Sequence, residues 1–371
     1  MLDRIDFDES ELEVKGEYRG RFGSPDNYRL NYPIPAGENL MAMYRGEKPL
    51  WIPRTMDIKP FGPRVLPENK VRGFVMEANR MSPEEYGGPD PFGVQWIFEP
   101  QVGGSMVRPG SPKVTDLDEW FDQIDHPDPD TWDWEGSAAS NKEFFEKNYA
   151  DEMPRVTLFT GFFERLISWI DFEDAAVAMI DEEDEENVHA IFEYLADFYI
   201  KEIRKVHEYF PGVQMVQLHD DWGSQAAPFF PLSVVEEMIV PHMKKVADAT
   251  HELGMIFDQH SCGFNRALAP AMVEIGVDSW QPQRINDSWA INEDVGKDMV
   301  IYCVPENTPK GLSPEEYDDM AHRWVDEHIE TFLERPFIFH PAPSDPTQKT
   351  YVDREFVRGV YKWSRIALNE A

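Results

Sequence analysis

A histidine and a cysteine two positions apart, His260 and Cys262, are the residues whose types and spacing point most directly to metal chemistry. They follow an apolar run that begins at Met255 and precede Gly263, so we expect them just past the end of a buried strand. An imidazole and a thiolate at this spacing could both reach one zinc ion, at about 2.0 to 2.3 Å. The alternative is a polar strand end with a small buried cysteine.

Further ligand types end other predicted strands. Cys303 ends the apolar run 299–303, and His340 ends the run 336–340. Three protein ligands and one open position are the arrangement of catalytic zinc. The chain has only two cysteines, too few for a disulfide framework, which leaves metal ligation, reactivity or simple burial for them. We therefore treat Cys303 and His340 as possible additional metal ligands beside the first pair.

The segment HDDWGSQ, at 219–225, follows another apolar run and provides acid–base groups. Adjacent side chains of an extended chain point to opposite sides, so only one of Asp220 and Asp221 can face a cavity. We expect Asp221 to handle a proton or to support a metal-bound histidine, with His219 and Glu164 as further catalytic candidates. The alternative is a turn rich in aspartate that caps the next helix.

Aromatic and amide side chains accompany these groups and predict a pocket for a flat ligand. The expected pocket residues are Phe163, Trp222, Gln225, Trp280 and Gln283. Aromatic residues make up 13% of the chain, so ordinary core packing is the competing explanation for Phe163, Trp222 and Trp280.

The elements that must position these residues alternate between short apolar runs and long amphipathic segments, which is typical of βα units with a parallel sheet. The predicted strands cover residues 155–161, 213–219, 255–260, 277–283, 299–303 and 336–340, with two more at 49–57 and within 71–98. Eight strands predict an α/β fold, a (β/α)8 TIM barrel formed by residues 1–371 as one domain, with residues 1–45 as an irregular N-terminal extension. The polar strand ends would then meet at the barrel mouth.

Helix boundaries are also visible in the sequence. One helix is expected from about Glu185 to Phe210, after the acidic run DEEDEE, which we interpret as a solvated helix entry. A second should begin with a capping box at Ser233 and be kinked or interrupted at Pro241. A third opens with Ser313, a proline and two glutamates, which is again a capping box.

The charge balance excludes several classes of partner. The chain has 35 basic and 70 acidic residues and a net charge of −35, which repels nucleic acids and anionic membranes. Because the sequence contains neither a leader pattern nor a long apolar run, we expect a soluble, cytoplasmic protein. No glycine-rich nucleotide-binding loop follows a predicted strand, which argues against a nucleotide cofactor.

Several motifs together resemble the uroporphyrinogen decarboxylase superfamily, and more narrowly its corrinoid-dependent methyltransferase branch, which includes methyltransferases that demethylate aromatic ethers. The resemblance covers about residues 40–365. It is carried by TGFFERL (160–166), HDDWGSQ with the helix after it, HSCG (260–263), the segment 267–283, VIYCVPE (300–306), DPFGVQW (90–96), VGGSMVRPG (102–110) and DLDEWFDQIDHPD (116–128).

The resemblance implies a metal site with one departure from the family pattern. Thiol-directed methyltransferases of this branch hold zinc with H-x-C and a later cysteine in a glycine-rich turn at the last strand. His260 and Cys262 match the first part, but the last strand continues into HPAPSDP, without cysteine or glycine. Either His340, Cys303 or an acid such as Glu164 or Asp221 would replace the third ligand.

The resemblance also implies a reaction and a partner. A methyl group would move from a small methylated substrate, for example a methoxylated aromatic compound, to cob(I)alamin on a separate corrinoid protein, because this chain has no recognisable corrin-binding motif. The resemblance leaves room for a homodimer as well. True decarboxylases carry an arginine-rich first strand, whereas WIPRTMDIKPFG has one arginine. A decarboxylase-like lyase and a barrel that binds without turnover are the alternatives.

Overall fold

The computed structural model describes residues 2–18, 27–101, 103–341 and 351–370. The chain forms two compact units, which we describe separately. Unit 1 comprises residues 1–59, 150–153 and 287–371, and unit 2 comprises residues 60–149 and 154–286. The prediction that residues 1–371 form a single domain with an extension at 1–45 stays a prediction.

Unit 2 is built on parallel strands that come in sequence order. Its strands are β7 (Met153–Leu158), β8 (Met215–His219), β9 (Ile256–Ser261) and β10 (Ser279–Pro282), and β7 begins at the boundary between the units. The register pairs Arg155 with Met215, Met215 with Ile256, and Ser279 with Asp258. These strands confirm the predicted ones to within two to three residues at either end.

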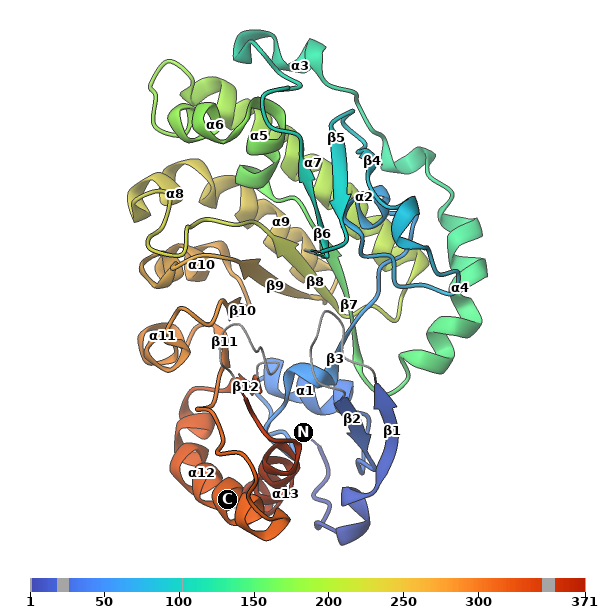
Figure 1. Ribbon diagram of the computed structural model, residues 1–371, viewed down its shortest axis with the longest axis vertical. Helices are drawn as coiled ribbons and strands as arrows, with labels where there is room; N and C mark the ends of the chain where they lie inside the picture. The colour runs from blue at the N-terminus through green and yellow to red at the C-terminus, as the bar shows by residue number, and fades with distance from the viewer. Residues whose placement is uncertain (1, 19–26, 102, 342–350, 371) are drawn as a thin grey trace. The chain divides into compact units, whose positions relative to one another are not determined.

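Helices connect and cover these strands (Figure 1). They are α5 (Phe162–Ile170), α6 (Phe172–Ala178), α7 (Glu185–Tyr209), α8 (Leu232–Met238), α9 (Val240–Glu252) and α10 (Ala269–Ile275). The predicted helix at 185–210 is confirmed as α7, directly after the acidic run. Pro241 interrupts the second predicted helix as expected, since α9 starts one residue before it. The capping box at Ser233 is wrong, because α8 begins at Leu232.

A second, antiparallel sheet in unit 2 corrects one expected barrel strand. β5 (Gln95–Glu99) pairs antiparallel with β4 (Gly88–Pro89) and with β6 (Gly104–Val107), so the strand expected within 71–98 is not part of the parallel sheet. The unit also contains the short helices α2 (Pro67–Arg72) and α3 (Trp120–Gln123) and the longer helix α4 (Trp134–Asn148).

Unit 1 contains the first and last parts of the chain. Its elements are β1 (Val14–Tyr18), β2 (Asn27–Leu30), α1 (Ala36–Tyr44), β3 (Ile58–Pro60, which ends at the boundary), α11 (Ser288–Val295), β11 (Val300–Cys303), α12 (Pro314–Glu334), β12 (Phe337–Phe339) and α13 (Arg354–Glu370). β11 and β12 pair in parallel, and the capping box at Ser313 is confirmed. The strand predicted at 49–57 is displaced to β3, because Asp57 accepts the backbone N–H of Arg54 and closes a 3-10 turn there.

The succession of parallel strands and helices along the chain is an α/β fold of the (β/α)8, TIM-barrel type, as the sequence predicted. Among the described residues, we find no helix that combines the length and the apolar character needed to cross a membrane.

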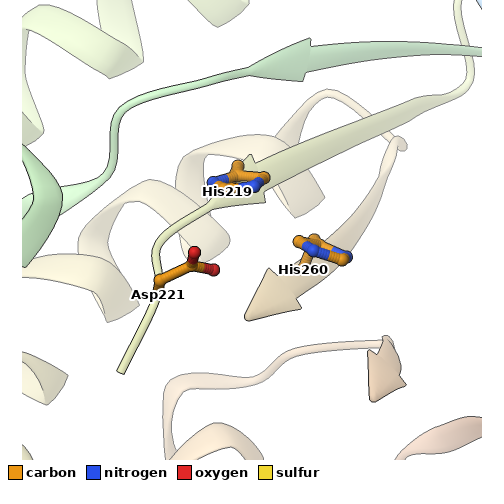
Figure 2. Close-up of side chains that lie close together, drawn as sticks. All are labelled: His219, Asp221 and His260. Atoms are coloured by element: carbon orange, nitrogen blue, oxygen red, sulfur yellow. The ribbon is translucent and has the colours of Figure 1, made fainter. Parts of the chain in front are cut away.

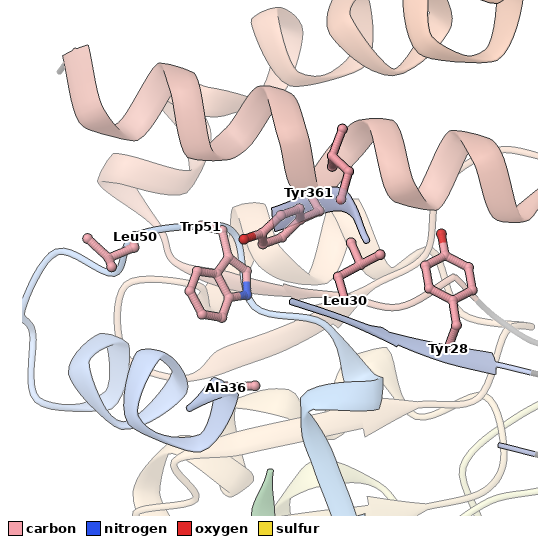
Figure 3. Close-up of a cluster of buried hydrophobic side chains, with 7 residues drawn as sticks. Tyr28, Leu30, Ala36, Leu50, Trp51 and Tyr361 are labelled. Atoms are coloured by element: carbon pink, nitrogen blue, oxygen red, sulfur yellow. The ribbon is translucent and has the colours of Figure 1, made fainter. Parts of the chain in front are cut away.

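The N-terminal segment is held in unit 1 by a core and by a buried ion pair. Trp51 stacks on Tyr32 and meets the ring of Tyr361 on α13 edge-on, within a cluster of buried side chains (Figure 3). Glu11 binds Arg365 through two hydrogen bonds of 2.9 Å, and the hydroxyl of Tyr361 donates to Glu11 at 2.6 Å. The start of the chain is therefore an anchored part of the fold.

Removing the charge of Glu11 should destabilise this anchor. In Glu11→Gln, the guanidinium of Arg365 stays buried without its carboxylate, so we expect a loss of about 3 kcal/mol in the free energy of unfolding, measured by urea denaturation. The control Glu13→Gln changes an exposed residue that pairs with Lys15 and should cost less than about 0.5 kcal/mol. Equal stability of the two variants would contradict the anchoring role.

Candidate functional site

Two histidines lie side by side at the ends of neighbouring strands of unit 2. His219 is the last residue of β8, and the parallel register places it opposite His260 on β9. Their rings are stacked, with centroids 4.8 Å apart and an interplanar angle of 26°. Figure 2 shows both imidazoles together with the carboxylate of Asp221, which comes from the loop after β8. The strand ends thus converge here as the sequence predicted for His219 and His260.

The donor atoms of these residues are close enough to share one ion. In the part of the chain that the structure describes, one group of three histidine, cysteine or acidic side chains could hold a metal ion together. It consists of His219, Asp221 and His260, whose ligand atoms lie within 4.8 Å of one another. The thiol of Cys262 lies 3.4 Å from Nε2 of His260. Tetrahedral zinc with ordinary bond lengths separates a nitrogen and a sulfur ligand by about 3.5 Å. The H-x-C pair therefore has the separation that zinc ligation requires.

The loop that carries Cys262 depends on the glycine after it. Gly263 has φ of +101°, and a Cβ there would lie 2.3 Å from the backbone of Gly223, so only glycine fits. The side-chain oxygen of Gln283 accepts the N–H of Gly263 at 2.9 Å and also a hydrogen bond from Gln225 at 3.0 Å. Two predicted pocket residues thus tie the loops after β8 and β9 together.

Asp221 also supports the cysteine through the backbone. Its Oδ1 accepts the N–H of Cys262 at 2.5 Å. This contact joins the two loops that present the donors, and it turns the Asp221 side chain toward the two histidines (Figure 2). The prediction that the two adjacent aspartates face different surroundings is consistent with this placement, since Asp220 is fully buried and contacts another helix.

Asp220 organises the start of helix α5. Its carboxylate accepts the backbone N–H groups of Phe162, Phe163 and Glu164 at 2.9 to 3.2 Å, and the indole N–H of Trp222 at 2.9 Å. These are the N–H groups that a helix start leaves without partners in the helix. Burial raises the pKa of Asp220 to about 7, with a further contribution from Glu164, and the hydrogen bonds oppose this shift.

Glu164, placed by that helix start, holds His219. Its Oε2 lies 2.7 Å from Nδ1 of His219, and its other oxygen lies 3.8 Å from the guanidinium of Arg72. Arg72 also donates to Thr160 at 3.2 Å and sits over the ring of Trp96. A carboxylate on one ring nitrogen fixes the other nitrogen, Nε2, as the one available to a ligand. Glu164 is therefore placed as the orienting partner of His219.

The two imidazoles differ in their affinity for protons. Burial alone lowers the pKa of His219, but the nearby carboxylate of Glu164 outweighs burial and the pKa is raised. Burial and the neighbouring His219 lower the pKa of His260 to about 3, so this ring is neutral at physiological pH. Burial and the charge of Asp221 raise the pKa of Cys262 to about 12. Without a cation the thiol stays protonated; a bound metal ion would deprotonate it.

The other predicted site residues lie in different surroundings. Phe163 and Trp222 are fully buried, beside Glu164 and Asp220 respectively. Trp280 pairs with Gln259 in the sheet, so it points to the face opposite His260. Cys303 and His340 belong to unit 1. There the sulfur of Cys303 lies 3.8 Å from the carbonyl oxygen of Ser288, and Nδ1 of His340 lies 2.7 Å from Oγ1 of Thr55. Their role as ligands stays a prediction, and residues 342–350, which contain most of HPAPSDP, lie outside the described residues.

Sequence reasoning missed two contributors to the site, the capping role of Asp220 and the side chain of Arg72. The sequence did not reveal that Asp220 caps the start of α5. A signal for it exists, because the GFFE start of α5 has no capping side chain of its own and needs an acceptor from elsewhere. Arg72 lies far from the motifs in sequence, and no local signal marks it. Gln281 belongs to the polar strand ends that the sequence placed at the barrel mouth; it lies on β10 opposite His260 on β9 and contributes a side-chain hydrogen bond there.

Comparisons with known proteins agree with this fold. A family model described as uroporphyrinogen decarboxylase (URO-D) matches residues 89–302, more than half of the chain. Among solved structures, a methyltransferase from Methanosarcina mazei aligns over 91% of this chain and 98% of its own, with a TM-score of 0.54 and 13% identity. Among curated proteins, no sequence matches.

More distant structures were also found. A hyperthermostable endo-1,4-beta-D-mannanase from Thermotoga petrophila RKU-1 aligns with a TM-score of 0.30 and 12% identity over 62% of this chain and 64% of its own. A second mannanase structure from Thermotoga petrophila gives a TM-score of 0.31 and 13% identity over 82% of this chain and 63% of its own.

Replacing the partner of His219 should change how this ring titrates. In metal-free Glu164→Gln, the charge that favours the imidazolium is gone, so the pKa of His219 should fall. Histidine NMR titration measures this, with the His219 signal assigned from a His219→Gln sample. Glu193→Gln is the matched control, because Glu193 contacts His242 instead. An unchanged His219 pKa in Glu164→Gln would show that the contact does not form in solution.

Proposed function

Because the chain belongs to the uroporphyrinogen decarboxylase family, we propose that it is a methyltransferase that moves a methyl group from a methoxylated aromatic substrate to the cob(I)alamin of a separate corrinoid protein. The observation that carries this proposal is the convergence of His219, Asp221 and His260, with Cys262 beside them. Nitrogen, oxygen and sulfur donors at one point fit a zinc site that assists cleavage at a heteroatom. The Methanosarcina mazei protein, which shares the fold along most of this chain, is a methyltransferase, and this is in line with the proposal.

The residues present fit a zinc ion by their chemistry. His260 is neutral and therefore a competent nitrogen ligand, and Cys262 lies at a ligand-like separation from it. Asp221 would be the third protein ligand, which leaves one coordination position for the substrate's oxygen. Glu164 would hold the His219 ring beside these ligands by its Nδ1, so that His219 could serve as an acid or a base. When bound, zinc would supply a Lewis acid that stabilises negative charge on the substrate's oxygen.

The methyl transfer itself is a balanced displacement. The bond between the methyl carbon and the aryl oxygen breaks, its electron pair stays on the oxygen, and the electron pair of cobalt(I) forms the new bond to carbon. A phenol has an intrinsic pKa near 10, so the leaving oxygen needs a proton or a nearby positive charge to leave at a useful rate. In the proposal, His219 provides that proton, because its contact with Glu164 favours the protonated ring. A ring nitrogen of His219 lies within 4.8 Å of donor atoms of Asp221 and His260.

The family's name makes decarboxylation the competing activity, and one residue argues against it. A substrate with several carboxylates needs accessible arginines, because a guanidinium group binds a carboxylate through two parallel hydrogen bonds. The single arginine of the predicted first strand, Arg54, is 1% exposed and pairs with Asp57 at 3.0 Å. Its guanidinium also lies over the ring of Tyr32. Arg54 is thus buried and paired within unit 1, and its guanidinium is not accessible to a substrate carboxylate.

Metal analysis is the first test of the proposal. We expect about one zinc per chain in protein purified without chelators, and loss of most of it in His260→Ala and in Cys262→Ala, because each variant removes a ligand. Mass spectrometry of acid-digested protein gives the stoichiometry.

The matched control uses the other cysteine. Cys303→Ala should retain zinc, because the Cys303 sulfur lies against a backbone carbonyl in unit 1. Loss of zinc in Cys303→Ala but not in Cys262→Ala would reverse the assignment. Wild-type protein that neither contains nor takes up zinc would remove the metal from the proposed mechanism.

An activity assay tests the reaction. With 1,2-dimethoxybenzene as donor and chemically reduced cobalamin as acceptor, we expect the absorption spectrum to change from cob(I)alamin to methylcobalamin. Glu164→Gln should slow this change roughly 10- to 100-fold through the disturbed His219. The control Glu193→Gln should be as active as the wild type. Decarboxylation of uroporphyrinogen that resists chelators, without methyl transfer, would favour the lyase instead.

A further inference from the structure

Helix α6 of unit 2 exposes apolar side chains that the proposed reaction does not use. Phe172 is 47% exposed, Val177 50% and Ile180 65%, and all three lie within nine residues on α6 and the turn after it. Figure 1 shows α6 next to α5, the helix whose start carries Glu164. Single exposed apolar residues are ordinary, but several of them close together in the chain, beside a groove, make a candidate interaction site.

A groove adjoins these side chains. It has a volume of about 430 Å³, and Val177 forms part of its wall. The apolar part of the lining also includes Pro112, Val114, Leu117 and Ile170. We call the groove, together with Phe172, Val177 and Ile180, the α6 surface. Its volume and the apolar part of its wall suit an apolar side chain from a partner, and the aspartates in the rest of its wall suit a basic flank.

The groove is held open by backbone contacts. The carboxylate of Asp171, between α5 and α6, accepts the N–H of Gly110 at 3.1 Å, and the N–H of Val114 donates to the carbonyl of Trp169 at 2.9 Å. Both contacts fasten the segment around residue 112 to the junction of the two helices. The α6 surface is therefore already formed in the free protein.

Negative charge surrounds the α6 surface. No lysine or arginine occurs between Arg165 and Lys201, whereas residues 171–186 contain nine acidic residues. Asp116, Asp174 and Asp184 line the groove. Burial and the neighbouring carboxylates, with Asp181 foremost, raise the pKa of Asp184, which reflects how closely the acids are placed. Lys113, beside the groove, lies 3.7 Å from Asp125. A cationic partner would relieve this repulsion.

Aromatic contacts connect the α6 surface to the candidate site. The ring of Phe172 lies 5.0 Å from that of Phe229, which in turn lies 5.8 Å from Phe163, the residue before Glu164. Phe229 also donates its backbone N–H to the carbonyl of Trp222. A protein bound at the α6 surface would therefore sit beside the residues that hold His219 and Asp221.

We infer that the α6 surface docks a partner protein through a segment that presents an apolar side chain flanked by lysines or arginines. Identifying this partner as the corrinoid protein rests on the proposed function. A second copy of this chain is disfavoured as the occupant, because its net charge is also −35.

A peptide can test the chemistry of the α6 surface without the partner. We would measure, by fluorescence anisotropy, the binding of a labelled helical peptide with leucines on one face and lysines on the other, and of a scrambled peptide of the same composition. The ordered peptide should bind roughly tenfold more tightly. Val177→Ser with Ile180→Ser should remove this preference, and Asp174→Asn with Asp184→Asn should weaken binding and its dependence on salt.

Matched controls come from helix α12. Leu333→Ser removes another exposed apolar residue, and Glu315→Gln with Asp319→Asn removes two other exposed acids, so both should bind the peptide like the wild type. Equal binding of the two peptides, or equal effects of the α6 and α12 variants, would show only general attraction to an acidic protein. Either result would overturn the inference.

The activity assay separates this inference from the proposed function. The Val177→Ser/Ile180→Ser variant should transfer methyl groups to free cob(I)alamin at the wild-type rate, but more slowly to cob(I)alamin carried by the corrinoid protein. Equal rates with the protein-bound acceptor would overturn the docking site and leave the methyltransferase intact. Absence of transfer to free cob(I)alamin by the wild type would count against the proposed function, while peptide binding would still decide the docking surface.

Discussion

The parallel register between β8 and β9 is the constraint on which the candidate site depends. Because the register is fixed, His219 and His260 stand opposite each other with stacked rings. A slip of one residue would turn either side chain to the other face of the sheet. One layer below, the same register brings Gln217 and Ser279 to the carboxylate of Asp258, with hydrogen bonds of 2.6 Å each. This polar layer replaces the branched apolar side chains that usually fill such an interior, and it ties three strands together beneath the histidines.

Much of this arrangement could be predicted from sequence because it rests on local patterns. The alternation of apolar runs and amphipathic helices gave the strands of unit 2 and the fold class, and the polar strand ends identified His219 and His260. The prediction of a strand at 49–57 was wrong, because Asp57 accepts the N–H of Arg54 and stabilises a turn there instead of an extended chain. The β propensity of this run gives no sign of that hydrogen bond. Neither the antiparallel pairing of β5 nor the partners of Cys303 and His340 can be derived from spacing, since each depends on contacts between distant segments.

The adjacent aspartates after β8 show how the same residue type can serve two purposes. Asp220 is turned away from the histidines and accepts N–H groups at the start of α5, which places Glu164 against His219. Asp221 faces the histidines and accepts the N–H of Cys262. The loop after β8 therefore positions Glu164 on α5 against His219 and also holds the backbone of Cys262 after β9. It can do both because adjacent side chains of an extended chain point to opposite sides. Sequence alone predicts that the two side chains separate, but not which helix or loop each one meets.

The balance of charge around the histidines argues for a cation at this point. Glu164 and Asp221 bring two carboxylates into one partly buried region, where the guanidinium of Arg72 lies 3.8 Å from Glu164. Glu164 raises the pKa of His219 against the effect of burial, and burial together with Asp221 raises the pKa of Cys262, so both groups retain their protons more readily. A divalent ion held by Asp221, His260 and Cys262 would supply fixed positive charge in place of these protons. The same ion would stabilise an anionic leaving oxygen, so the groups that gather negative charge beside the histidines are also those that would hold the ion where it can assist the reaction.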